Sequence, residues 1–122
     1  MGMQHMKAIA AHTKVLNSVS RCIRGGKACH CYKPHTDCEF GLWLYSKLIP
    51  ASLSASAHVQ EVVQEIEVTH LKFHNVIKKI EQSTKDGNAE ETKKLETDLM
   101  GLSNKLIQHI LSIDSELSTM EL

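Results

Sequence analysis

The stretch SAHVQEVVQEIEVTHLKFHNVIKKIEQSTK, residues 56–85, decides the fold. Its apolar positions alternate at steps of four and three residues, which is the period of one face of an α-helix. A seam of this kind faces partner helices in a coiled-coil-like bundle. The stretch therefore predicts a long helix over residues 56–85, and its seam consists of Val59, Val63, Ile66, His70, Phe73, Ile77 and Ile80.

Residues 4–24 predict a second long helix. Its apolar positions also recur at steps of three and four residues, and two glycines follow, as is common where a helix ends. The stretch KACHCYKPHT, residues 27–36, has no periodicity and contains a proline, so we interpret it as a loop. The stripe of this helix consists of Ile9, His12, Leu16, Val19 and Ile23.

A short helix is predicted over residues 38–48, with Asp37 as its N-cap. Phe40 and Trp43 would bury this helix against the rest of the bundle. Pro50 and the serine-rich ASLSAS that follows would end the helix and form a connector.

The last long helix is predicted over residues 89–118. The residues Asp86-Gly87-Asn88 interrupt the preceding pattern, and Asn88 with Glu91 three residues later resembles a capping box. The stripe of this helix consists of Leu95, Leu99, Leu102, Leu106, Ile110, Ile113 and Leu117.

Together these segments predict an all-α protein. We expect an antiparallel four-helix bundle of three long helices and one short helix, forming a single domain over residues 1–122. Each amphipathic helix must bury one stripe, and short connections favour antiparallel neighbours. Only six glycines and two prolines occur in 122 residues, which also favours helix.

Charge and hydropathy narrow the range of partners. Fourteen basic and fourteen acidic residues give no net charge, so we expect neither nucleic acid nor a membrane as a partner. No apolar run is long enough to span a bilayer and no leader opens the chain, so we expect a cytoplasmic protein with reduced cysteines. In that compartment, four cysteines and eight histidines indicate a metal site or catalysis rather than disulfides.

Histidines occupy positions in two of the apolar seams. His12 lies in the first stripe and His70 in the long seam, and an unpaired polar group in a core costs about 1–3 kcal/mol. His74 completes the pattern His70-x-x-x-His74, which places two imidazoles on one face of a helix, where both can reach one metal ion. Leu71 replaces the Glu that follows the first His in zinc peptidases, which argues against peptidase chemistry.

Cys38 is the fourth candidate ligand. At the first turn of a helix, the positive end of the helix dipole favours the thiolate, which is the form that binds metal. Together with His12, His70 and His74, it supplies the four nitrogen and sulfur donors that zinc takes in a tetrahedral site. A closed shell leaves no position for water, which favours a structural or sensory role over catalysis. The donor types alone also suit nickel, cobalt or copper.

The same residues carry a resemblance to a known family. The chain has His12 in AAHTKV, then CEFGLW from Cys38 to Trp43, then HLKFH from His70 to His74. It resembles the CZB domain, the chemoreceptor zinc-binding domain of bacteria. The pattern of that family is an early His, then Cys-x-[Leu/Phe]-Gly-x-Trp, then His-x-x-x-His.

This resemblance implies a zinc ion held by His12, Cys38, His70 and His74 in a four-helix bundle that is often dimeric. CZB domains belong to cytoplasmic chemoreceptors or diguanylate cyclases, or stand alone. The implied partners are therefore a second copy of the chain and a signalling protein, in cis or in trans. The implied role is sensory rather than enzymatic, with zinc itself or oxidation of the ligating cysteine as the signal.

Further polar residues lie near these ligands in the sequence. Glu67, one turn before His70, and Asp37, beside Cys38, are candidates to hydrogen-bond the ligands from outside the coordination sphere. We interpret the residues of the Cys- and His-rich loop mainly as exposed, with an accessory thiol or a second metal site as the alternative; they include Cys29, Cys31 and His35.

Three other classes of protein are alternatives to the sensor. A di-iron bundle needs Glu-x-x-His on two helices, and Glu67-x-x-His70 has no second copy. A Cys–His nucleophile needs an open cleft and a third orienting group, and the sequence indicates neither. A structural or interaction bundle with buried histidines remains the alternative, and it predicts no bound metal.

Overall fold

The computed structural model describes residues 4–24 and 38–120, and the side chains of these ranges from residue 6 onward. Within these ranges every regular element is helical. Their order along the chain is α1 (Gln4–Arg24), α2 (Glu39–Trp43), the π-helix η1 (Leu44–Leu48), α3 (Ile49–Ser52), α4 (Ala57–Lys85), α5 (Ala89–Ser112) and α6 (Asp114–Thr119).

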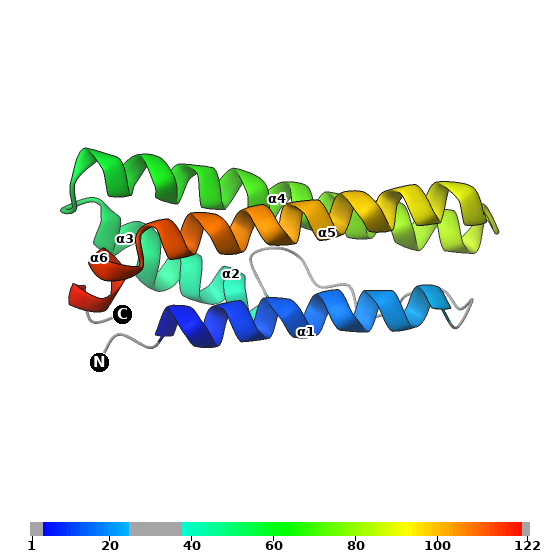
Figure 1. Cartoon of the computed structure of the whole chain (residues 1–122), viewed down its shortest axis with the longest axis horizontal. Helices are drawn as coiled ribbons and strands as arrows, with labels where there is room; N and C mark the ends of the chain where they lie inside the picture. The colour runs from blue at the N-terminus through cyan, green and yellow to red at the C-terminus, as the bar shows by residue number, and fades with distance from the viewer. Residues whose placement is uncertain (1–3, 25–37, 121–122) are drawn as a thin grey trace.

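The helices form an up-and-down bundle (Figure 1). α4 and α5 pack against each other as an antiparallel hairpin, and α1 lies along one side of it. α2, η1 and α3 run end to end as one short rod between α1 and the hairpin, at the end of the bundle where α6 lies. When this rod is counted as one helix, the predicted all-α four-helix bundle of three long helices and one short helix is confirmed.

Side-chain caps fix the ends of the two longest helices. The Ser56 hydroxyl accepts a hydrogen bond from the Val59 N–H at 3.3 Å where α4 begins. The Asn88 side chain accepts one from the Glu91 N–H at 3.1 Å where α5 begins. Gly87, in the turn between α4 and α5, has φ +68°, a left-handed conformation that glycine adopts without strain. The predicted boundaries of the long helix and the start of the last helix are therefore confirmed.

The short rod differs from its prediction in two ways. Cys38 rather than Asp37 is the N-cap residue, because its own sulfur accepts the Gly41 N–H. The rod also continues through Pro50 to Ser52 instead of ending at residue 48. Pro50 lies in the first turn of α3, directly after the wider π turn of η1. We attribute its tolerance to that wider turn, because a proline normally clashes with the carbonyl four residues before it.

The last helix also differs from its prediction. α5 ends at Ser112, Ile113 has φ −118° and ψ 22°, and α6 begins at Asp114. Ile113 and Leu117 stay fully buried across this break. The apolar stripe therefore continues past the break, which is why its period predicted one uninterrupted helix.

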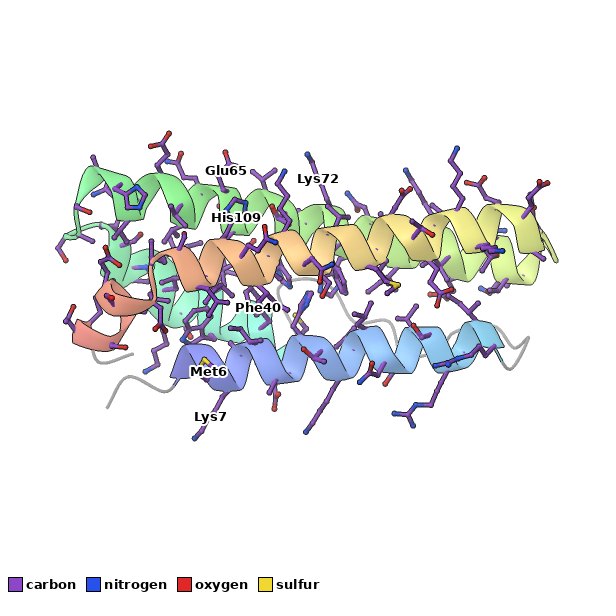
Figure 2. All side chains as sticks on the ribbon, viewed as in Figure 1. Met6, Lys7, Phe40, Glu65, Lys72 and His109 are labelled. Atoms are coloured by element: carbon purple, nitrogen blue, oxygen red, sulfur yellow. The ribbon has the colours of Figure 1, made fainter. Side chains whose placement is uncertain are left out.

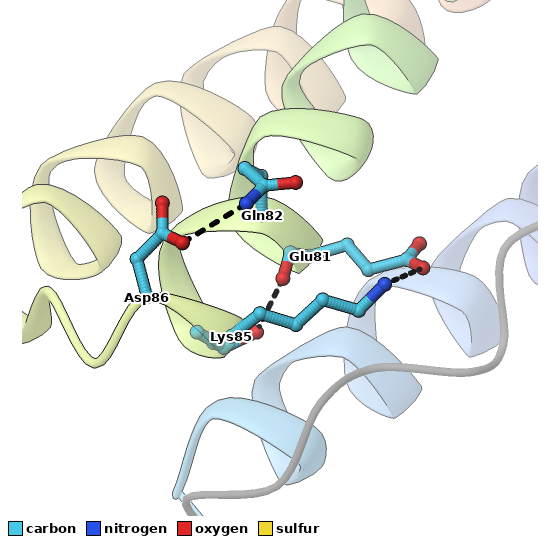
Figure 3. A network of polar contacts seen from close by, with 5 residues as sticks. Glu81, Gln82, Lys85 and Asp86 are labelled. Atoms are coloured by element: carbon cyan, nitrogen blue, oxygen red, sulfur yellow. Dashed lines mark hydrogen bonds and ion pairs between the residues drawn. The ribbon is translucent and has the colours of Figure 1, made fainter.

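Polar contacts at the far end of α4 lie at the surface (Figure 3). Lys85 Nζ lies 3.7 Å from a Glu81 carboxylate oxygen, and the Gln82 amide donates to Asp86 Oδ1 at 3.0 Å. Exposed pairs of this kind contribute about 0–1 kcal/mol each. Burial of the apolar stripes is therefore the main contribution to holding the hairpin together.

Two apolar clusters fill the bundle, and the buried His12, His70 and His74 lie between them. One cluster gathers the short rod with the first half of α4 and the end of α5. The other joins α1 to the second half of α4 and the first half of α5, around Val19, Phe73 and Leu99. Among the described residues, no helix combines the length and the apolar character needed to cross a membrane.

Candidate metal centre

His70 and His74 of α4 point into the core. They are 0% and 3% exposed, and their Nε2 atoms lie 3.1 Å apart. Their spacing of four residues places one ring a turn above the other on the buried face of the helix. The two imidazoles of the HxxxH pattern therefore converge on one point, as the sequence predicted.

Cys38 meets both rings from the start of the short rod. Its sulfur lies 3.3 Å from His70 Nε2 and 3.5 Å from His74 Nε2, and the residue is 6% exposed. The Gly41 N–H donates to this sulfur at 3.2 Å. That donor and the N-terminus of the helix both favour negative charge on the sulfur, which is the state a metal ligand requires.

The distances among these three ligand atoms suit zinc. A tetrahedral site with bonds of about 2.3 Å to sulfur and about 2.0–2.1 Å to nitrogen holds two nitrogens about 3.3 Å apart, and sulfur and nitrogen about 3.5 Å apart. The chain has 3.1 Å for the former separation and 3.3 and 3.5 Å for the latter. Cys38, His70 and His74 therefore form a buried group that can hold a metal ion.

His12 of α1 borders this group. Its ring centre lies 5.8 Å from that of His70, 4.0 Å from that of Phe73 and 5.3 Å from that of Phe40. The residue is 2% exposed, and neither ring nitrogen has a hydrogen-bond partner within the described chain. Burial, and secondarily the charge of His74, lowers the pKa of His12 to about 3. The imidazole is therefore neutral, as a ligand must be, and its lone pair is unused.

Comparisons of the chain with protein-family models, with curated proteins and with solved structures found no match.

Aromatic rings close the site on one side, and a small cleft opens it on another. The Phe40 ring centre lies 4.8 Å from that of His70, and Figure 2 places Phe40 inside the bundle, beside α1. A cleft of about 240 Å³ between α1 and the start of the short rod reaches His12, Cys38 and His74. The ligand residues are thus largely shielded from solvent, and the cleft borders three of them.

A hydrogen bond that the sequence did not predict links the short rod to α4. The Tyr45 hydroxyl donates to the Glu67 carboxylate, and burial, followed by this hydrogen bond and the Glu67 charge, raises the pKa of Tyr45 to about 12. The sequence predicted a hydrogen bond from His70 to Glu67, and that hydrogen bond stays a prediction. Sequence periodicity does not predict the contact between Tyr45 and Glu67, because it does not specify how one helix is positioned against the other.

The remaining predicted positions lie outside the described residues. They are Asp37, expected beside Cys38, and the accessory candidates Cys29, Cys31 and His35.

Proposed function

We propose that this chain is a zinc-binding sensory or regulatory domain. The observation that carries the proposal is the set of distances among Cys38 Sγ, His70 Nε2 and His74 Nε2, which lie between 3.1 and 3.5 Å. Three such atoms converging in a buried group match the donors and spacing of a zinc site.

His12 would complete the ligand set. Two buried nitrogens without partners are costly, and a zinc ion would use one of them. The His12 ring borders the cluster. Three imidazoles and one thiolate fill the tetrahedral shell and leave no position for a catalytic water. We therefore propose a sensor rather than an enzyme.

The ligand residues come from three different helices. His12 lies on α1, Cys38 at the start of α2, and His70 and His74 on α4. A bound zinc ion would supply a cross-link among these helices. Hydrogen peroxide that transfers one oxygen atom to the Cys38 thiolate, and is itself reduced to water, would leave a sulfenic acid in place of the thiolate donor. The short rod would then lose one of its attachments to α4.

The resemblance to the CZB family supplies the biological setting of this proposal. In that setting the chain acts in the bacterial cytoplasm as a homodimer. The change in packing of the short rod is transmitted to a chemoreceptor or a diguanylate cyclase, in cis or in trans. The signal is zinc availability or oxidation of Cys38.

Cobalt titration of the metal-free protein tests the ligand set. A thiolate–cobalt charge-transfer band with tetrahedral d–d bands should appear and saturate at about one cobalt per chain, the load of a single site. Cys38→Ser should remove the charge-transfer band, His70→Ala should abolish the tetrahedral spectrum, and the exposed His58→Ala should change nothing. A cobalt spectrum that is the same in the wild type and in Cys38→Ser would refute the assignment. Peroxide should release zinc from the wild type, and retention of zinc by a protein oxidised at Cys38 would refute the redox part.

The alternative is a structural bundle in which the buried groups bond one another without metal. The separations of 3.1–3.5 Å also suit hydrogen bonds among Cys38, His70 and His74. The unpartnered nitrogens of His12 disfavour this alternative, because nothing in the described chain satisfies them.

A further inference from the structure

A basic groove lies on the solvent-facing side of the α4–α5 hairpin. It has a volume of about 540 Å³ and is open to the surface. Its α4 wall carries Lys72 and Lys79, its α5 wall carries Lys105, and Gly101 and the half-buried Leu102 lie between them. None of these residues belongs to the metal centre, which lies on the buried face of α4.

The three lysines are not neutralised within the described chain. No ion pair or hydrogen bond joins the side chain of Lys72, Lys79 or Lys105 to any described residue. Asp98 is the one acidic residue among the described residues that line the groove. Figure 2 shows Lys72 projecting outward from α4. Lys72 and Lys79 lie seven residues apart, which is about 10.5 Å along a helix. The groove therefore presents a positive edge with a two-turn repeat.

Gly101 gives the groove a bare backbone in the middle of α5. A Cβ atom built at this position would meet no atom within 4 Å, so packing inside the described chain does not require glycine. Glycine is nevertheless less stable than alanine in a helix interior. Its absent side chain is an advantage where another backbone must approach closely.

We propose that this groove binds an acidic amphipathic helix of a partner protein. The partner helix crosses at Gly101, its apolar residues meet Val76 and Leu102, and carboxylates seven residues apart pair with Lys72 and Lys79. The apolar floor and Asp98 disfavour a nucleic acid. Three lysines are fewer than the clusters of four to eight that typically mark binding to anionic lipid. The inference does not depend on zinc, because the groove is built from the outer faces of α4 and α5.

Fluorescence anisotropy tests the proposal with a synthetic probe. The probe is a labelled 18-residue helical peptide with glutamates seven residues apart beside an Ala/Leu stripe, and the control peptide carries glutamine at the same positions. The acidic peptide should bind more tightly than the control, and the difference should shrink as salt rises. Equal binding of both peptides would overturn the proposal.

Variants then locate the binding. Lys72→Glu/Lys79→Glu should weaken acidic-peptide binding about tenfold through lost attraction and new repulsion. Gly101→Gln should weaken binding of both peptides by filling the crossing point. The exposed pair Lys7→Glu/Lys47→Glu makes the same charge change elsewhere and should have little effect.

Three results would contradict this assignment. The first is equal weakening by the two charge-reversed pairs. The second is tighter binding of heparin or phosphatidylserine vesicles than of the peptide. The third is self-association in sedimentation that Lys72→Glu/Lys79→Glu abolishes, because the face would then belong to a second copy of the chain.

Discussion

Replacing His12 with phenylalanine should change the metal-free and the zinc-bound protein in opposite directions. Both ring nitrogens are buried without partners, and each unsatisfied polar group costs about 1–3 kcal/mol. Phenylalanine removes that penalty, which is about 2–4 kcal/mol for the two nitrogens together at the lower part of this range, and keeps ring contacts with Phe40 and Phe73. Its extra volume costs about 1–2 kcal/mol of overpacking, and the adjoining cleft relieves part of this cost. We expect the metal-free variant to gain about 1–2 kcal/mol, or about 3–10 °C in Tm.

In the zinc-bound variant, the loss of metal binding should exceed this gain in stability. Removal of one of four ligands should weaken zinc binding at least about 100-fold, which is about 2.7 kcal/mol, so saturating zinc should raise the Tm of the variant less than that of the wild type. Calorimetry with and without zinc measures both effects, and His58→Phe makes the same substitution at an exposed position as a control. A metal-free His12→Phe protein that is less stable than the wild type, or one whose zinc affinity is unchanged, would refute the reasoning.

Three further predictions concern pH, a cross-helix hydrogen bond and the surface glycine. The pKa of His12 in the folded protein lies near 3, below the ordinary 6.5. The stability linked to its neutral form is therefore fully present above pH 6.5 and is lost as the pH falls towards 3. Urea unfolding of metal-free protein should show about 2 kcal/mol more loss between pH 7 and 5 for the wild type than for His12→Phe, and equal losses would contradict this. Tyr45→Phe leaves the Glu67 carboxylate without its donor and should lower stability by about 1–2 kcal/mol; an unchanged Tm beside a Ser46→Ala control would argue against that hydrogen bond. Gly101→Ala should raise stability by about 0.5–1 kcal/mol, and a loss would mean that an unseen neighbour crowds the site.

Helix periodicity predicted most of the fold because each stripe serves a single buried face. Every seam position of α4 is buried in the structure, and the capping residues Ser56 and Asn88 lie at the predicted starts. The break at Ile113 was missed because the stripe continues across it. The π turn of η1 was missed because its i→i+5 bonding leaves no composition signal that distinguishes it from an α-helix.

The candidate site was predicted in part. The HxxxH spacing predicted that His70 and His74 share one face of a helix, and the position of Cys38 at a helix start made it a candidate ligand. Their grouping into one site was a hypothesis from the donor types and from the resemblance to the CZB family. The contact between Tyr45 and Glu67 and the ring packing of His12 on Phe73 depend on how three helices are turned towards one another. Sequence periodicity assigns a residue to the inner face of its helix, but it does not specify the neighbour on the facing helix.

Metal content tests the central claim most directly. The chain would be purified under reducing conditions without an affinity metal, and its zinc measured by elemental analysis against protein concentration. A single four-ligand site predicts about one zinc per chain, lost in Cys38→Ala and in His70→Ala and retained in His58→Ala. A protein that contains no metal and takes up no zinc on titration would contradict the account and leave a helical bundle in which Cys38, His70 and His74 hydrogen-bond one another without metal.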